Sequence, residues 1–315
     1  MPGYADRVTM RVDERQALDE LDVRLKVLLP EEYRDSYDTV QPTSMGSAGL
    51  KYDVAGRVAW DEIWGSFCDL AMAGGPPHKG TLLEPGSRAA IAAQPERHDE
   101  VVAEICRGIV MTTELPAKAS STPGWVRVDC LSDTMSAWLV RAIVMENVAV
   151  RLDGRALHLP AAPAFRLEKE IKNVITVMAK TCHYYLGHIP RAQKLAIADL
   201  FVTLNARLPL VEPGGVAPDE RAAQQPLAET MAGMIQEASG LSASDRRYDG
   251  WLGVTCADVR TAIWMMRALV ASNVLARREG TVLFVPVNAS RSSHGEIVTR
   301  TLAEVHRLAV AAGIC

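Results

Sequence analysis

The stretch GWVRVDCLSDTMSAWLVRAIVMENVAVRLDGRALHLP, residues 124–160, returns later in the chain in a related form. A shift of 126 positions aligns it without gaps with GWLGVTCADVRTAIWMMRALVASNVLARREGTVLFVP, residues 250–286, and 14 of the 37 aligned pairs are identical. Agreement of this extent at one fixed offset indicates an internal repeat. The identical pairs include two tryptophans, two arginines and two asparagines: Trp138 with Trp264, Arg141 with Arg267, and Asn147 with Asn273.

Within each copy, the local pattern predicts a strand, a helix and a hairpin in that order. VRVDC and LGVTC alternate or run apolar over a few residues, as short strands do. Ser132 or Asp133 is expected to cap the next helix in the first copy, and Asp258 in the second. The helix is expected to end near Asn147 or Asn273, because asparagine tolerates the left-handed conformation. Two-residue hairpin turns follow in both copies, at Asp153-Gly154 and Glu279-Gly280.

The repeat extends upstream of the best-preserved block. LLEPG at 82–86 recurs as LVEPG at 210–214, and an amphipathic segment of helical period occurs in each half. We therefore expect an α+β fold, predominantly helical, in which a helix-helix-strand-helix-hairpin module occurs twice with pseudo-twofold symmetry. The expected domains are an N-terminal helical extension at 1–49, repeats at 50–163 and 164–290, and a C-terminal helix at 291–315.

A helix followed by a hairpin is also typical of winged-helix DNA readers. The formal net charge of −4 and the isoelectric point near 6.0 provide no basic field for a phosphate backbone. The repeated helix offers mainly apolar side chains, and Arg141 is nearly the only one suited to reading base edges. We expect winged-helix-like packing without binding of nucleic acid. A non-catalytic sensor, scaffold or partner subunit that binds protein, or less readily DNA, is the alternative function.

Composition limits the remaining classes. The 315 residues are 48% hydrophobic, no apolar leader follows the first charges, and no run of 18 apolar residues occurs, so a cytoplasmic protein with no membrane partner is expected. The six scattered cysteines form no C-x-x-C pair and are predicted to be reduced, buried thiols. No G-x-G-x-x-G, G-x-S-x-G or P-loop pattern occurs, so no nucleotide cofactor is indicated. A homo-oligomer is compatible with all of this.

The repeated arginines have two possible roles. Structural needs recur in both copies, which favours Arg141 and Arg267 as buried partners of a carbonyl or carboxylate, with Glu84 and Glu212 as candidate acceptors. They are also candidate ligand-binding residues.

Chemistry is best sought where the copies differ, and the first such segment is residues 60–86. Apolar residues from Trp60 to Ala71 recur at helical spacing and predict a helix that stops at GGPP. The turn at Gly75 then presents His78 and Lys79. Backbone N–H groups in such a turn can bind an anion, with Lys79 adding charge and His78 a titratable group. An ordinary helix-ending loop is the alternative.

The second differing segment is residues 170–193. Its apolar stripe predicts a helix that buries Cys182, while Lys180 and His183 share another face and His188 lies at the helix end. Two histidines five residues apart do not form the i, i+4 pair that binds zinc from one helix face. A metal site would therefore need a ligand from the first segment. The candidate set is His78, His183, His188 and Cys68.

Aligning Cys68 with Cys182 places Asp69 opposite His183, as a carboxylate that orients a general base. We expect catalysis by His78, His183 and Asp69, in a pocket between the repeats. Residues predicted to bind the ligand are Lys79, Gly75, Lys180, His188, Arg141, Arg267, and Ser44 and Ser47 of a small-residue loop. An added helix after Pro190 is a candidate lid, with simple additional core as the alternative. The expected function is a cytosolic enzyme that performs proton-transfer chemistry, as a lyase, isomerase, hydrolase or transferase, on a small polar or anionic metabolite.

Overall fold

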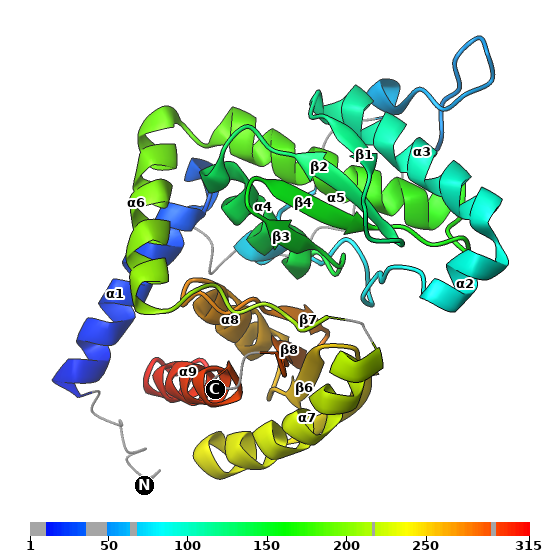
Figure 1. Ribbon diagram of the computed structural model, residues 1–315. Coiled ribbons are helices and arrows are strands. Elements are labelled where there is room, and N and C mark those ends of the chain that lie inside the picture. Colours follow the sequence, from blue (N-terminus) through cyan, green and yellow to red (C-terminus); the bar gives the residue numbers. More distant parts are fainter. Residues whose placement is uncertain (1–10, 36–48, 64–67, 216–217, 291–293) are drawn as a thin grey trace, which may run out of the picture. The chain divides into compact units, whose positions relative to one another are not determined.

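The computed structural model describes residues 11–35, 49–63, 68–215, 218–290 and 294–315. The described chain has an α+β fold with more helix than strand, as expected, and contains two four-stranded antiparallel sheets (Figure 1). Its contacts divide it into two compact units. Unit 1 consists of Met1–Lys26 and Leu204–Cys315, and unit 2 of Val27–Thr203. Residues 164–203 thus belong to the same unit as the first sheet, whereas the repeat boundaries inferred from the sequence stay a prediction.

The sheet of unit 2 has the strand order β1-β2-β4-β3. Its strands are β1 (Ala117–Ala119), β2 (Trp125–Asp129), β3 (Arg151–Asp153) and β4 (Ala156–Pro160). Helix α4 (Asp133–Met145) connects β2 to β3 and begins where the Ser132 hydroxyl accepts the backbone N–H of Met135. Asn147 follows the helix with φ of 60°, so the predicted cap and left-handed end are both confirmed.

The sheet of unit 1 has the corresponding order β5-β6-β8-β7. Its strands are β5 (Ala243–Tyr248), β6 (Trp251–Thr255), β7 (Arg277–Glu279) and β8 (Val282–Pro286). Helix α8 (Val259–Val270) connects β6 to β7, is capped by the Asp258 carboxylate, and is followed by Asn273 with φ of 66°. Both hairpins turn where the sequence predicts, at Gly154 and Gly280 with φ of 56° and 61°.

Unit 2 contains further helices besides α4. They are the end of α1 (Val12–Leu28), α2 (Arg88–Ala93), α3 (Pro95–Thr113), α5 (Lys172–His183) and most of α6 (Arg191–Arg207), with 3-10 turns at Glu31–Tyr33, Trp60–Glu62 and Ala71–Ala73 and π-helical turns at Leu167–Ile171 and Tyr184–His188. Helix α3 contacts strands β1 and β2 and packs against α5, and a side chain at Gly108 would meet Ile175 Cδ1 at 2.3 Å. Cys182 on α5 is buried, as predicted. The added helix after Pro190 is confirmed as α6.

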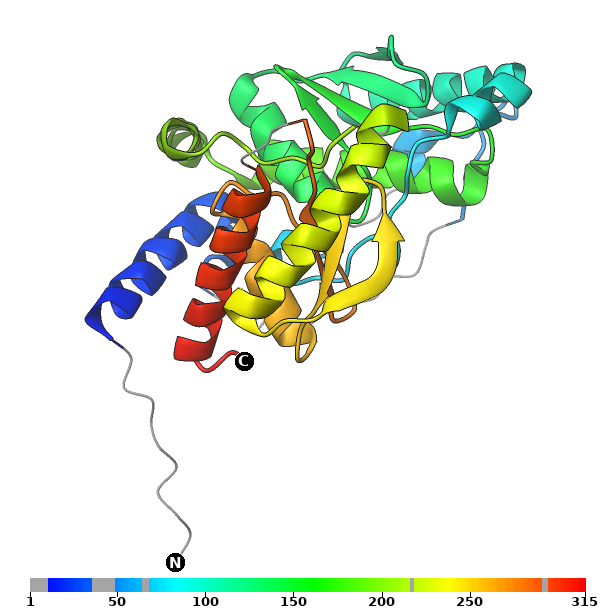
Figure 2. The same ribbon diagram turned by 60° about the horizontal axis from the view of Figure 1, so that its bottom comes forward.

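Two further helices complete unit 1. They are α7 (Pro218–Ser239) and α9 (His294–Ala311), which pack side by side in both views (Figures 1 and 2). Met231 and Ile235 of α7 and Leu302 of α9 are fully buried. The predicted C-terminal helix is confirmed as α9.

Two local predictions are wrong or incomplete. The helix predicted from Trp60 to Ala71 is not formed over the described part of that segment, where 3-10 turns occupy only its ends and Leu70 is extended, with φ of −66° and ψ of 139°. A side-chain carboxylate, described below, accepts the N–H of Ala71 in place of a helical carbonyl. The sequence pattern does not predict strands β1 and β5, because AKA is only three residues long, ASDRRY is mostly polar, and both lie at sheet edges.

Candidate functional site

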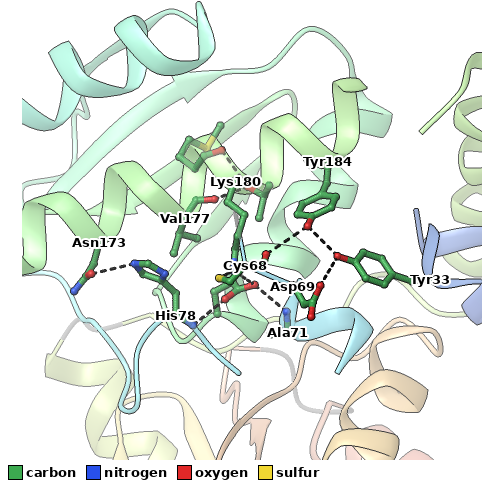
Figure 3. Close-up of polar contacts among 12 residues, drawn as sticks. Tyr33, Cys68, Asp69, Ala71, His78, Asn173, Val177, Lys180 and Tyr184 are labelled. Carbon is green, nitrogen blue, oxygen red and sulfur yellow. Dashed lines mark hydrogen bonds and ion pairs between the residues drawn. The ribbon is translucent and has the colours of Figure 1, made fainter. Parts of the chain in front are cut away.

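The two segments in which the copies differ contact each other inside unit 2. His78 Nε2 lies 3.0 Å from Asn173 Oδ1 on α5, and the Lys180 ammonium donates to Cys68 Sγ over 3.4 Å (Figure 3). The extended turn at residues 68–79 therefore lies along one side of α5. Two of the predicted site segments, about 100 residues apart in sequence, are therefore in contact.

Glu146 joins these groups. Its Oε1 lies 2.8 Å from Lys180 Nζ and accepts the N–H of Ala71, while Oε2 accepts the N–H of His78. The Glu146 and Lys180 side chains are both fully buried. We call Glu146, Lys180, Cys68, His78 and Asn173 the Lys180 cluster. The N–H groups of Ala71 and His78 thus donate to a carboxylate of the chain itself, and the binding of an external anion by this turn stays a prediction.

Burial and charge determine the ionisation of this cluster. Burial alone lowers the pKa of Lys180, but the adjacent Glu146 carboxylate and Cys68 more than offset it, so the net pKa is raised and the ammonium persists. Burial, with Lys180 nearby, lowers the pKa of His78 to about 4. His78 is therefore neutral near pH 7 and suits a hydrogen-bonding role better than that of a general base.

Backbone contacts hold the same turn in place. A side chain at Gly75 would lie 2.5 Å from the Asp69 carbonyl oxygen, which accounts for glycine there. The N–H of Lys79 donates to the Glu146 carbonyl, and Asn147 Nδ2 donates to the Lys79 carbonyl over 2.9 Å. The turn is thus bound at both ends to the end of α4. His78 and Lys79 themselves are half-buried.

A second chain of polar groups begins at Asp69. The Tyr33 hydroxyl donates to Asp69 Oδ1 over 2.9 Å and lies 2.8 Å from the Tyr184 hydroxyl, which in turn reaches the Cys68 carbonyl at 3.4 Å (Figure 3). Burial, and then the contacts with Tyr184 and Asp69, raise the pKa of Tyr33. Tyr33 is therefore a neutral phenol that keeps its proton and donates it in a hydrogen bond. We call Asp69, Tyr33 and Tyr184 the tyrosine chain.

The two histidines at the end of α5 meet, contrary to the expectation from their spacing. His183 Nε2 and His188 Nε2 are 3.0 Å apart, and His188 Nδ1 lies 2.5 Å from Glu32 Oε2. The reason is that residues 184–188 form a π-helical turn, in which positions five apart fall on one face. Lys180 and His183 do not share an exposed face, because Lys180 is buried while His183 is exposed.

The remaining predicted site residues have separate outcomes. Ser44 and Ser47 lie outside the described residues. Arg141 and Arg267 are buried; the Arg141 guanidinium donates to the Ala137 carbonyl and lies 4.1 Å from the centre of the Phe201 ring. The pairing of these arginines with Glu84 or Glu212, and that of Asp69 with His183, stay predictions.

The metal site predicted from the sequence requires His78 or Cys68 to lie beside His183 and His188. Within the described residues, no three or more His, Cys, Asp or Glu side chains come together in a geometry that could hold a metal ion. Cys68 and His78 belong instead to the Lys180 cluster.

The sequence reasoning missed five polar residues of this region. They are Glu32, Tyr33, Glu146, Asn173 and Tyr184. A signal existed for one of them: Glu146 aligns with Ser272 inside the best-preserved block and is thus a difference between the copies. Asn173 and Tyr184 lie in the second differing segment, residues 170–193, so their segment was identified although they were not. Glu32 and Tyr33 lie outside both differing segments and carry no comparable signal.

Comparison with family models, with curated proteins and with solved structures finds no match. Among the helices that the structure describes, none combines the length and hydrophobicity that a membrane span requires.

Proposed function

We propose that the chain is a cytoplasmic enzyme that acts on a small polar or anionic metabolite by proton transfer, at the tyrosine chain and the adjacent turn of unit 2. The observation that carries this proposal is the hydrogen-bonded series from Asp69 through Tyr33 to Tyr184 beside half-buried Cys68. A carboxylate that orients a proton-bearing group is the usual arrangement of an acid–base catalyst.

The residues around the tyrosine chain have complementary roles in this proposal. Asp69 accepts the hydrogen bond of the Tyr33 hydroxyl and fixes the direction of that hydroxyl. Lys79, half-buried in the turn, supplies positive charge for an anionic substrate group. His78 is neutral and bound to Asn173, so it would position the substrate by hydrogen bonds. The Glu146–Lys180 pair fixes the turn and has no direct chemical role.

We also propose that the two sheet modules descend from a duplicated winged-helix-like unit. Strand pairing supports this: Trp125 faces Pro160 in one sheet and Trp251 faces Pro286 in the other. A parallel bridge at the sheet margin also occurs in both, between Leu83 and Val148 and between Val211 and Val274. The connecting helix α4 is almost wholly buried, which does not favour a recognition role for it in DNA binding.

Ligand capture followed by turnover tests the enzymatic proposal. Freshly purified protein would be denatured and its small-molecule content identified by mass spectrometry, and the compound found would then serve as substrate. We expect Asp69→Asn and Tyr33→Phe to lower kcat by roughly 10²- to 10⁴-fold, the usual contribution of one acid–base group. Tyr52→Phe, a half-exposed tyrosine elsewhere in unit 2, is the matched control and should leave kcat unchanged.

Two results would overturn the proposal. One is that no compound copurifies and none in a metabolite panel raises the unfolding temperature. The other is that Asp69→Asn and Tyr33→Phe retain the wild-type rate. Retention of the protein on immobilised DNA, lost at higher salt, would favour the non-catalytic alternative instead.

A further inference from the structure

His183, His188 and Glu32 form a group that the proposed acid–base chemistry does not use. His183 is exposed, and His188 and Glu32 have side chains that are 36% and 37% exposed. The two Nε2 atoms face each other at 3.0 Å, and the carboxylate lies on the opposite edge of the His188 ring, against Nδ1. We call these three residues the histidine group.

This arrangement has the features of one side of a metal site. Imidazole nitrogens bind divalent ions of the late first transition series, and a ligating histidine usually gives its other ring N–H to a carboxylate. Glu32 occupies that supporting position for His188. The carboxylate fixes the ring and the tautomer in which the His188 Nε2 lone pair accepts the hydrogen bond of His183 Nε2. A bound ion would replace this hydrogen bond, with the His183 proton moved to its Nδ1.

The distance between the nitrogens fits a single shared ion. Two nitrogens 3.0 Å apart can both lie at the usual metal–nitrogen distance of about 2.0–2.1 Å from one point. The angle at the metal would then be roughly 90°, which suits tetragonal or octahedral coordination more than a regular tetrahedron. Ni²⁺ is accordingly the appropriate probe.

The local backbone is what makes the convergence possible. In a regular α-helix, positions five apart differ by about 140° around the axis and point in different directions. The π-helical turn Tyr184–His188 removes that divergence, and π-helical turns occur often at functional sites. Tyr184 inside the turn is buried, and its ring centre lies 5.1 Å from that of His188, which fixes the position of the turn.

We propose that His183 and His188 bind one divalent late first-row transition-metal ion through their Nε2 atoms, with Glu32 supporting His188. Water or a ligand group completes the coordination, because two imidazoles leave positions open. The proposal concerns metal binding alone and holds whether or not the tyrosine chain is catalytic. Metal binding without turnover would refute only the proposed function.

Isothermal titration calorimetry, in which Ni²⁺ alone is added to the untagged full-length protein, tests the proposed metal site. We expect one saturable site per chain that is lost in His183→Gln and in His188→Gln. Glu32→Gln should weaken binding roughly 10- to 100-fold, as loss of a supporting carboxylate does. Glu31→Gln and His306→Gln are matched controls for the carboxylate and the imidazole, and should bind as the wild type does.

Further variants separate this site from the alternatives. Cys68→Ser should leave Ni²⁺ binding unchanged, because Cys68 contacts Lys180 and not the histidine group. Thermal unfolding of each variant without metal shows whether it is folded, and His183→Asn provides a second substitution if His183→Gln is not. The proposal is overturned if the wild type binds no Ni²⁺ saturably, or if the His183→Gln/His188→Gln double variant binds it as tightly as the wild type.

Discussion

The first and second sheet modules share a backbone plan but differ in what they hold at the end of the connecting helix. After α4, Asn147 Nδ2 donates to the Lys79 carbonyl, and after α8, Asn273 Nδ2 donates to the Leu208 carbonyl. One residue earlier the modules diverge, with buried Glu146 in the first and half-buried Ser272 in the second. Structural capping is thus common to both modules, whereas a buried charge occurs at this position only in the first.

This difference accompanies a difference in the segment that precedes each module, since the irregular turn before the first module contacts Glu146. The Glu146 carboxylate accepts hydrogen bonds from the backbone N–H groups of Ala71 and His78 and forms an ion pair with Lys180. At the corresponding place before the second module, the chain forms helix α6 up to Arg207 and needs no side-chain carboxylate. We infer that Glu146 determines the course of the turn. The three predictions below test how the two modules differ, in order of expected size.

The largest effect is expected when the second module's residue replaces Glu146. Glu146→Ser leaves the buried Lys180 ammonium without its carboxylate and two N–H groups without their acceptor. Removing one partner of a buried ion pair costs about 3–5 kcal/mol. We therefore expect the free energy of unfolding to fall by that amount, measured by denaturant titration with hydrogen exchange of the α5 amides.

Two companion variants identify the cause of that loss. Ser272→Ala, the change at the aligned position of the second module, should alter the free energy of unfolding by less than about 0.5 kcal/mol, because it removes one uncharged hydroxyl from a half-buried position. Glu146→Gln combined with Lys180→Met removes both charges and should recover much of the loss. A Glu146→Ser protein as stable as the wild type would show that the pair does not hold the turn.

The second largest change is a loss of stability of unit 2 at acid pH. Burial lowers the pKa of His78 from 6.5 to about 4, so the unfolded chain binds a proton in this pH range that the folded chain does not. Stability is then unaffected above pH 6.5 and falls as the pH drops towards 4, by up to about 3 kcal/mol. The difference between wild type and His78→Gln in denaturant titrations from pH 7 to 4.5 measures this slope.

A direct observation can contradict this prediction. The imidazole resonances of His78 in an NMR titration should shift near pH 4. His306 on α9 of unit 1, with a smaller lowering of its pKa caused by burial, is the internal comparison and should titrate at a higher pH than His78. A midpoint for His78 near 6.5 would mean that the turn opens and hydrates the ring.

The sequence was sufficient for the features that depend on local chemistry. Helix caps, left-handed asparagines and hairpin glycines follow from the conformational preferences of those residues, and all are found in both modules. The apolar stripe of 170–193 likewise placed Cys182 in the core. The helix predicted at 60–71 failed because a carboxylate 75 residues away competes for the N–H of Ala71, and local periodicity contains no information about that contact.

The candidate site was predictable only in part for the same reason. The interpretation of the spacing of His183 and His188 assumes regular α-helix geometry, which the π-helical turn replaces. Tyr33 and Glu32 precede the other site residues by more than thirty positions and resemble ordinary surface residues of a 3-10 turn. Their importance arises from tertiary contacts with Asp69 and His188, which the sequence alone does not specify.

The smallest change in stability is expected when the helix caps of the two modules are altered. Ser132 accepts the N–H of Met135 over 3.1 Å, and the Asp258 carboxylate accepts that of Thr261 over 2.7 Å. Ser132→Ala should cost about 1 kcal/mol at any pH where the protein is folded, because a hydroxyl does not titrate there. The backbone and side-chain hydrogen bonds of Thr261 lower the pKa of Asp258, so its contribution is fully present above the ordinary Asp value of 3.8 and is lost as the pH falls through the lower folded value.

Exchanging the cap residue makes this difference measurable. Asp258→Ser places the cap residue of the first module in the second module. The unfolding temperature of this variant should lie slightly below that of the wild type at pH 6, because the charged wild-type carboxylate also interacts favourably with the helix dipole. The deficit should shrink as the pH is lowered through 3.8, since the wild-type carboxylate becomes protonated. Ser132→Asp should gain stability at pH 6 for the same reason. Equal behaviour of the two caps at both pH values would mean that only their geometry matters, and the modules would then differ energetically at Glu146 but not at the starts of their helices.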